Sequence, residues 1–262
     1  MPTAIISDIH GNAEALRTVM ADIGRRGVDR VICLGDIIGY GPDPLECVDM
    51  VAERCAWSLM GNHDFGVLYE PTNFNPAAGA AAYWTREQFD REPDAAARSR
   101  RYEFLGRLRV RVVEKPAGAP FPLLAVHGSP RRPINEYIFP DDVMTAVDKI
   151  KQVFDRIDRV ALVGHTHVPG VFTDEPDFYS PDELGGSVYT ASASEKAIIN
   201  VGSVGQPRDH DPRASYVVMH HDDGAMKFEF VRLEYDVAKT AEKIKGTAEL
   251  SDWLGDRLYE GR

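Results

Sequence analysis

Short apolar runs recur along the chain, and each of them stops at a polar cluster. These runs are rich in β-branched and aliphatic residues, lack a helical period and are bounded by glycine, which predicts buried strands. The expected strands cover residues 3–7, 30–34, 56–60, 122–126 and 159–163. The clusters that follow them read DIHGN, GDIIGYGP, GNHD, HGSP and GHTH. Each polar cluster therefore begins where a predicted strand ends.

Helical periods alternate with these runs. Apolar residues form one stripe along 13–26, where Asn12 is available as the N-cap, and another along 142–157, while Pro44 suits the first turn of a helix over 44–54. Further elements are expected as strands at 168–172, 197–201, 215–219 and 227–233, a mobile loop at 173–186 and a last helix at 237–245. Alternating strands and helices indicate an α/β fold, in which ligands gather beyond the carboxyl ends of the strands.

The segment 73–113 departs from this alternation. An Ala-rich helical run starts at Asn75 and Pro76, and residues 99–108 are basic and amphipathic. A lid or an interface is one interpretation, and a surface helical excursion is the favoured one. Because no linker or composition break divides the rest of the chain, we expect a single domain over 1–262 with a helical excursion at about 73–113.

Composition and charge narrow the classes of function. The chain has 262 residues, of which 44% are hydrophobic, and a net charge of −11, so an extended nucleic-acid surface is not expected. Neither a signal sequence nor an apolar run of roughly 18 residues is recognisable, which predicts a cytoplasmic protein without a membrane partner. Cys33, Cys47 and Cys55 lack metal-ligand spacing and are expected to be reduced thiols. The oligomeric state stays open.

Imidazoles concentrate in the polar clusters. Five of the eight histidines lie there, accompanied by carboxylates and an amide. The set is His10, His63, His127, His165 and His167 with Asp8, Asp36, Asn62 and Asp64. Turn formation or helix capping would explain Asn12 and Asp64, but not so many imidazoles. A mixed imidazole and carboxylate set without thiolate suits manganese, iron or zinc better than calcium or magnesium.

The spacing of these residues predicts a site for two cations. Asp8 and His10 alternate at one strand end, and His165 and His167 do the same on a strand expected to be its neighbour. Asp36 follows a third strand between the others and is placed to bridge two ions. A bridging carboxylate holds cations roughly 3.5–4 Å apart, the spacing used for in-line displacement at phosphorus.

The motifs D-x-H, GD, GNHD, H and GHTH, in this order from Asp8 to His167, resemble the calcineurin-like metallophosphoesterase superfamily. SDIHGN and the late segment NVGSVGQPRD at 200–209 are similar to its small bacterial and archaeal phosphodiesterase branch. The resemblance implies a four-layer α/β/β/α sandwich of two mixed sheets flanked by helices. It also implies a binuclear hydrolase in which a hydroxide shared by the metals attacks phosphorus.

The resemblance also implies a role for each motif residue. Seven side chains would hold two divalent ions: Asp8, His10 and His167 the first, Asn62, His127 and His165 the second, and Asp36 both. Manganese is the preferred ion, with iron, zinc, nickel and cobalt as alternatives. His63 would act near the leaving oxygen, as a general acid or a transition-state donor, and Asp64 would orient its imidazole.

One departure from the superfamily pattern bears on the substrate. Protein phosphatases and dinucleoside tetraphosphatases of this superfamily carry the motif GDxxDRGP, whose arginine binds phosphate. This chain has Gly39 and Tyr40 at the positions of the second aspartate and the arginine. Arg208 is a candidate substitute and would bind substrate with Asn62 and His63. We therefore expect a phosphodiesterase for a small substrate, with monoesters open. The alternatives are a nucleotide-pyrophosphate or dinucleoside-polyphosphate hydrolase and, less favoured, a non-catalytic scaffold of the same fold.

Overall fold

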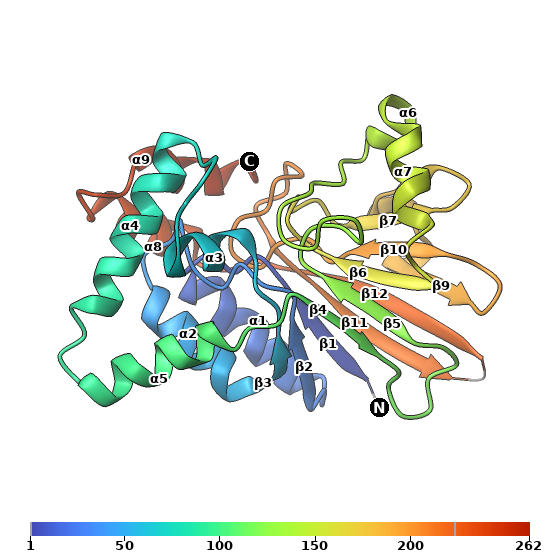
Figure 1. The fold of residues 1–262 in the computed structure, drawn as a ribbon, viewed down its shortest axis with the longest axis horizontal. Helices are drawn as coiled ribbons and strands as arrows, with labels where there is room; N and C mark the ends of the chain where they lie inside the picture. Colours follow the sequence, from blue (N-terminus) through green and yellow to red (C-terminus); the bar gives the residue numbers. More distant parts are fainter. Residues whose placement is uncertain (1, 223) are drawn as a thin grey trace.

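Two six-stranded mixed sheets form the centre of the computed structural model, which describes residues 2–222 and 224–262. The first sheet has the order β3 (Cys55–Ser58), β2 (Arg30–Cys33), β1 (Thr3–Ile6), β11 (Ala214–Asp222), β12 (Ala225–Leu233) and β9 (Val188–Ser192). The second has the order β4 (Arg111–Glu114), β5 (Leu123–Val126), β6 (Val160–Val163), β10 (Ala197–Asn200), β7 (Gly170–Thr173) and β8 (Asp177–Tyr179). The sheets face one another and helices lie outside them (Figure 1), as expected for the four-layer sandwich.

The alternation of side chains along β1 explains the layers. Ala4 and Ile6 are fully buried in the core between the first sheet and its helices, whereas Ile5 is buried between the two sheets. Successive residues of a strand point to opposite faces, so a strand covered on both sides must be apolar throughout. Burial of one such aliphatic side chain contributes about 1.5–3 kcal/mol. This is why the predicted strands are continuous apolar runs.

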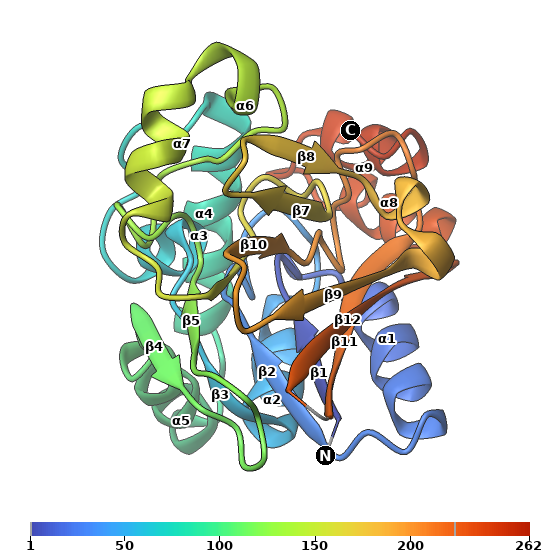
Figure 2. The ribbon, with the colours of Figure 1, turned by 90° about the vertical axis from the view of Figure 1, so that its right-hand side faces the viewer.

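Helices that were predicted from their apolar periodicity cover the outer faces of the two sheets. α1 (Ala13–Arg25) and α2 (Pro44–Arg54) pack on the first sheet, and α1 is N-capped by Asn12, whose side chain accepts from the amide of Ala15. α6 (Asp142–Thr145) and α7 (Val147–Phe154) follow β5, and α7 covers the second sheet (Figure 2). One continuous helix was expected over 142–157. It is interrupted at Ala146, whose backbone leaves the helical region at φ −140° and ψ 47°.

The segment 73–113 is largely helical. It contains α4 (Pro76–Asp90) and α5 (Ala95–Gly106) and ends in β4, which pairs with β5. α3 (Asn62–Leu68) precedes it. At one end of the molecule α4 packs against α8 (Val237–Lys245) and α9 (Asp252–Asp256) (Figure 1). The sequence did not predict α3, α9, β4 or β9.

The expectation of a mobile loop at 173–186 is wrong in part. β8 lies in this stretch and pairs antiparallel with β7, and short 3-10 helices follow it. A three-residue strand is too short to show an alternating pattern, so its pairing depends on the neighbouring strand. In the part of the chain that the structure describes, no helix has the length and apolarity to cross a membrane.

β1 and β6 belong to different sheets, although they were expected to be neighbours. Gly164 donates its amide proton to the carbonyl of His127, and the amide of Asp8 donates to Gly35. The amide of His165, which follows β6, donates to the Asp8 carboxylate at 3.0 Å. The carboxyl ends of the two parallel strand sets therefore meet at one edge of the sandwich, and the polar clusters converge there.

Candidate metal centre

The polar clusters bring six imidazole and carboxylate side chains into one buried site. Each of them is at most 3% exposed. They come from the ends of β1 (Asp8, His10), β2 (Asp36), β5 (His127) and β6 (His165, His167). Asn62, the first residue of α3, lies beside them, and its Oδ1 is buried without a hydrogen-bond partner among the described residues.

The ligand atoms fall into two groups that share Asp36. Asp8, His10, Asp36 and His167 form one group, and Asp36, His127 and His165 form the other. In each group the potential ligand atoms lie within 4.8 Å of one another. Ring nitrogens even face one another, with His10 Nε2 3.1 Å from His167 Nε2 and His127 Nε2 3.2 Å from His165 Nδ1. Lone pairs converging in this way fit a pair of cations.

Backbone carbonyls fix the orientation of two imidazoles. His127 Nδ1 lies 3.0 Å from the Leu34 carbonyl oxygen, and His167 Nδ1 lies 2.5 Å from that of Gln206. A carbonyl oxygen can only accept, so each Nδ1 carries a proton, and each Nε2 faces the carboxylates of Asp8 or Asp36. Such bonds from the far side of the ring are the usual support of metal-binding histidines.

An unusual backbone conformation bends the side chains inward. Five of the residues in these groups have positive φ, namely Asp8 (53°), His10 (49°), Asp36 (51°), His165 (68°) and His167 (60°). Left-handed backbone is uncommon outside glycine and costs of order 1–3 kcal/mol where it is strained. Residues in this conformation cluster at functional sites, where the surrounding structure holds them in place. All five are aspartate or histidine, residue types that are enriched at positive φ, but the sequence analysis did not anticipate this conformation.

Asp64 supports the turn that carries Asp36. One carboxylate oxygen of Asp64 accepts from the amides of Asp36 (2.9 Å) and Gly61 (3.0 Å), and the other accepts from Ile37 and Ile38. The amide of His63 donates to Asp36 Oδ1 at 2.8 Å, which leaves Asp36 Oδ2 facing His10 and His127. A Cβ at Gly61 would overlap with Asp36 Oδ1, so glycine is required there. Asp64 was expected to orient the His63 imidazole, but its carboxylate accepts hydrogen bonds from backbone amides instead.

Burial and neighbouring charge set the protonation of the site. Burial opposes ionisation of Asp36, yet His127 and His63 hold the pKa of its carboxyl well below the usual range. Burial would lower the pKa of His127, but the carboxylates of Asp36 and Asp8 raise it to about 9. Burial lowers the pKa of His165 to about 3 and that of His10 well below its usual value. The neutral imidazoles of His10 and His165 beside ionised carboxylates are suited to a divalent cation, whereas His127 would have to release a proton to bind one.

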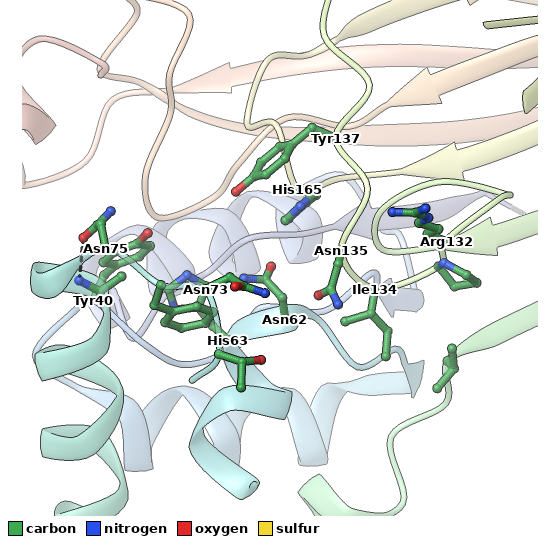
Figure 3. Close-up of a pocket in the computed structure, with 15 residues that line it drawn as sticks. Tyr40, Asn62, His63, Asn73, Asn75, Arg132, Ile134, Asn135, Tyr137 and His165 are labelled. Carbon is green, nitrogen blue, oxygen red and sulfur yellow. Dashed lines mark hydrogen bonds between the residues drawn. The ribbon is translucent and has the colours of Figure 1, made fainter. Parts of the chain in front are cut away.

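A pocket of about 670 Å³ opens beside these groups (Figure 3). It is lined by amides, aromatic rings and one arginine, among them Asn62, Asn73, Asn75, Asn135, Tyr40, Phe74, Tyr137 and Arg132. The buried imidazole of His63 forms part of its wall, with ring centroids 4.3 Å from Tyr40 and 4.5 Å from Phe74. Burial lowers the pKa of His63 to about 4, so the ring is neutral near pH 7.

Arg208 lies next to the position where the superfamily pattern has its arginine. Its guanidinium is 5.9 Å from the centre of the Tyr40 ring, and it donates to Gln206 Oε1 at 2.7 Å. Asp209, the next residue along the chain, pairs with Arg232. Tertiary structure thus brings a positive charge from a distant segment to Tyr40.

Several supporting residues were not assigned a role from the sequence. Tyr137 stacks on His165 with ring centroids 3.7 Å apart and an interplanar angle of 18°. Asn200 donates to the carbonyl of Gly164, and Ser203 Oγ donates to that of Asp8 at 2.7 Å. The NVGS segment had been recognised only as a mark of resemblance. It ties the ends of β1 and β6 together.

Comparisons with known proteins agree with this geometry. The model of the calcineurin-like phosphoesterase family matches residues 1–169. An uncharacterized protein of Methanocaldococcus jannaschii is 39% identical, the match covering 99% of this chain and 98% of the relative. A metallophosphoesterase from Sphaerobacter thermophilus is similar in structure, with 37% identity, a TM-score of 0.79 and coverage of 100% and 99% of the two chains. A hypothetical protein from Pyrococcus horikoshii, at 18% identity, shares the fold with a TM-score of 0.73 over 100% and 98%.

Proposed function

The chain belongs to the calcineurin-like phosphoesterase family, and from this premise we propose that it hydrolyses phosphodiesters of small molecules at a two-metal site. The observation that carries the proposal is the shared position of Asp36 in two adjoining ligand groups. A scaffold protein would not need imidazoles and ionised carboxylates to converge in a buried site, where such groups are costly. We further propose that residues 1–262 act as one domain, with the helices of 73–113 beside the pocket.

The residues divide into two proposed ligand sets. Asp8, His10 and His167 would hold one ion, Asn62, His127 and His165 the other, and Asp36 both. Two divalent ions, manganese for preference, would neutralise phosphoryl oxygens and make bound water acidic enough to attack phosphorus. Asn62 fits the second set because an amide oxygen that is buried without a partner is available as a ligand.

His63 is proposed as the donor to the leaving oxygen. Its ring lines the pocket beside Asn62 and is held among Tyr40, Phe74 and His10. Burial keeps this imidazole neutral, with a single ring N–H. It would donate a hydrogen bond from this N–H to the developing charge and would not need to be a doubly protonated imidazolium. Asp64 would contribute indirectly, by holding the Asp36 turn.

Charge balance favours a diester over a monoester. The arginine of the GDxxDRGP pattern is replaced by Tyr40, and Arg208 supplies one positive charge near that point. A diester carries one negative charge and a monoester up to two, so a site with little arginine loses less with a diester. Phosphopeptides are the least favoured substrates because the chain carries a net charge of −11.

The proposal is tested on metal-free protein reconstituted with manganese, iron, zinc, nickel or cobalt. kcat/KM is compared for bis-p-nitrophenyl phosphate, p-nitrophenyl phosphate and a phosphopeptide. We expect metal-dependent hydrolysis with the diester preferred over the phosphopeptide. A phosphopeptide preference of about tenfold or more, equivalent to about 1.4 kcal/mol of transition-state discrimination, would overturn the substrate assignment. Loss of hydrolysis with every metal would overturn the enzymatic one.

A further inference from the structure

We propose that Arg132 forms a second anion site in the pocket, which selects substrates that carry a terminal phosphate apart from the scissile one. This inference rests on the proposed phosphodiesterase function and names the class of substrate for the same site. Arg132 belongs to the turn after β5 that directly follows His127. It lines the pocket that also contains Asn62, His63 and His165.

The turn that presents Arg132 is held by its own hydrogen bonds. Ser129 is fully buried, and its hydroxyl donates to Glu136 and accepts from the amides of Arg131 and Arg132, both at 3.1 Å. The amide of Gly128 donates to the carbonyl of Pro133 at 2.6 Å. The guanidinium therefore extends from a fixed backbone, which reduces the entropy lost when it binds an anion.

The two adjacent arginines differ in their partners. Arg131 forms an ion pair with Glu136 at 3.3 Å and donates to Gln152, so its charge is already used within the protein. The side chain of Arg132 has neither an ion pair nor a hydrogen bond within the described part of the chain. In a protein with a net charge of −11, a free guanidinium facing a pocket is a local site for an anion.

The position of Arg132 separates this site from the metal ligands. In Figure 3 it lies at the end of the pocket away from Tyr40, His63 and Asn75, and the proposed metal ligands Asn62 and His165 lie between the two ends. An anion bound at Arg132 would therefore belong to a part of the substrate other than the leaving group beside His63.

The chemistry of an exposed guanidinium favours phosphate over carboxylate. Arginine binds both in a bidentate manner, but a phosphate offers three oxygens and up to two charges. An exposed pair of single charges contributes little in water, whereas a dianion gains more from the same guanidinium. The neutral amide of Asn135 beside Arg132 adds a further hydrogen-bonding group to the pocket wall.

The test compares two substrates that differ only in the second phosphate. They are the p-nitrophenyl diester of thymidine 5′-phosphate and the same compound phosphorylated on its 3′ hydroxyl, each assayed on the manganese-loaded full chain. We expect kcat/KM to be about fivefold to tenfold higher for the phosphorylated compound, and the preference to fall with added salt. In Arg132→Gln the preference should fall below about twofold, while hydrolysis of bis-p-nitrophenyl phosphate stays unchanged. Arg132→Lys should keep part of the preference because it keeps the charge but loses the planar fork.

Arg156→Gln is the matched control, because among the described residues the Arg156 guanidinium donates only to the carbonyl of Gln152 in α7, and its loss removes the same charge. It should keep the wild-type preference. An equal fall in both arginine variants would overturn the site in favour of a general charge effect, and so would a preference that persists in Arg132→Gln. Hydrolysis of bis-p-nitrophenyl phosphate without any preference would overturn the Arg132 site alone. If no diester is hydrolysed, the proposed function fails, and binding of thymidine bisphosphate against thymidine 5′-phosphate, measured by calorimetry, still decides the Arg132 site.

Discussion

Replacement of Asp64 by asparagine removes one of its two carboxylate oxygens, and each of these oxygens accepts two backbone hydrogen bonds. One accepts from Asp36 and Gly61 at 2.9 and 3.0 Å, and the other from Ile37 and Ile38 at 3.0 and 3.3 Å. The amide group of asparagine would put an NH₂ where one oxygen accepts, so two buried amides lose their partner. A hydrogen bond to a charged group contributes about 1.5–3 kcal/mol, so the loss is about 3–6 kcal/mol.

The consequence should reach the metal site through the backbone. These amides belong to the turn that holds Asp36 at a φ of 51°, and a turn released from Asp64 no longer fixes the shared carboxylate. A loss of about 3–6 kcal/mol is a large part of the 5–15 kcal/mol by which a typical domain is stable. We therefore expect Asp64→Asn to unfold at a much lower urea concentration and to bind metal more weakly. A residue that only oriented His63 would affect turnover alone.

The assay is urea unfolding of the metal-free protein, followed by calorimetric titration with manganese. Burial and the charge of Asp36 raise the pKa of Asp64 above its usual range, so the comparison is made at about pH 8, where ionisation is favoured. Asp94→Asn is the control, because Asp94 accepts from the amides of Ala96 and Ala97 at the exposed start of α5. Asparagine caps helices about as well as aspartate. A loss in Asp64→Asn no greater than in Asp94→Asn would refute the reasoning.

Substitutions at three further positions test the divided roles. Asp36→Ala should lose one or both ions, and full double occupancy in elemental analysis and anomalous diffraction would contradict the bridge. His63→Ala should keep its metal, measured by elemental analysis, yet lose about 10²–10⁴-fold in turnover; loss of metal would identify a ligand instead. Tyr137→Ala should weaken binding of one of two manganese ions in calorimetry, because stacking orients His165, whereas Tyr137→Phe keeps the ring and should bind normally. Equal weakening in both variants would assign the effect to the hydroxyl.

Local patterns predicted the strands that lead into the site and the side chains that follow them. β1, β2, β5 and β6 lie within or one residue from the expected runs, because residues buried on both faces of a sheet leave an unbroken apolar signature. The residues that follow them form the two ligand groups, since carboxyl ends of parallel strands share an edge. The family resemblance added the four-layer arrangement, which alternation alone could not distinguish from other α/β folds.

Other features left no local trace. β8 and β9 are short or half-exposed strands whose pairing depends on β7 and β12. The break at Ala146 occurs inside an apolar stripe that continues across it, so the periodicity does not reveal it. Positive φ at metal-ligand candidates such as Asp8 and His165 is imposed by the turns around them, because a residue type that tolerates this conformation does not by itself require it.

The sequence by itself determined which side chains stand at the strand ends, because strand burial and turn chemistry act between near neighbours. Only the tertiary structure decided how those ends meet. It places β1 and β6 in opposite sheets, brings the His165 amide to the Asp8 carboxylate across 157 residues and puts Arg208 over Tyr40. It also pairs the Asp64 carboxylate with backbone amides and leaves the Arg132 guanidinium at the pocket without a hydrogen bond or ion pair among the described residues. Contacts of this kind depend on how distant segments pack, and packing is a property of the whole core.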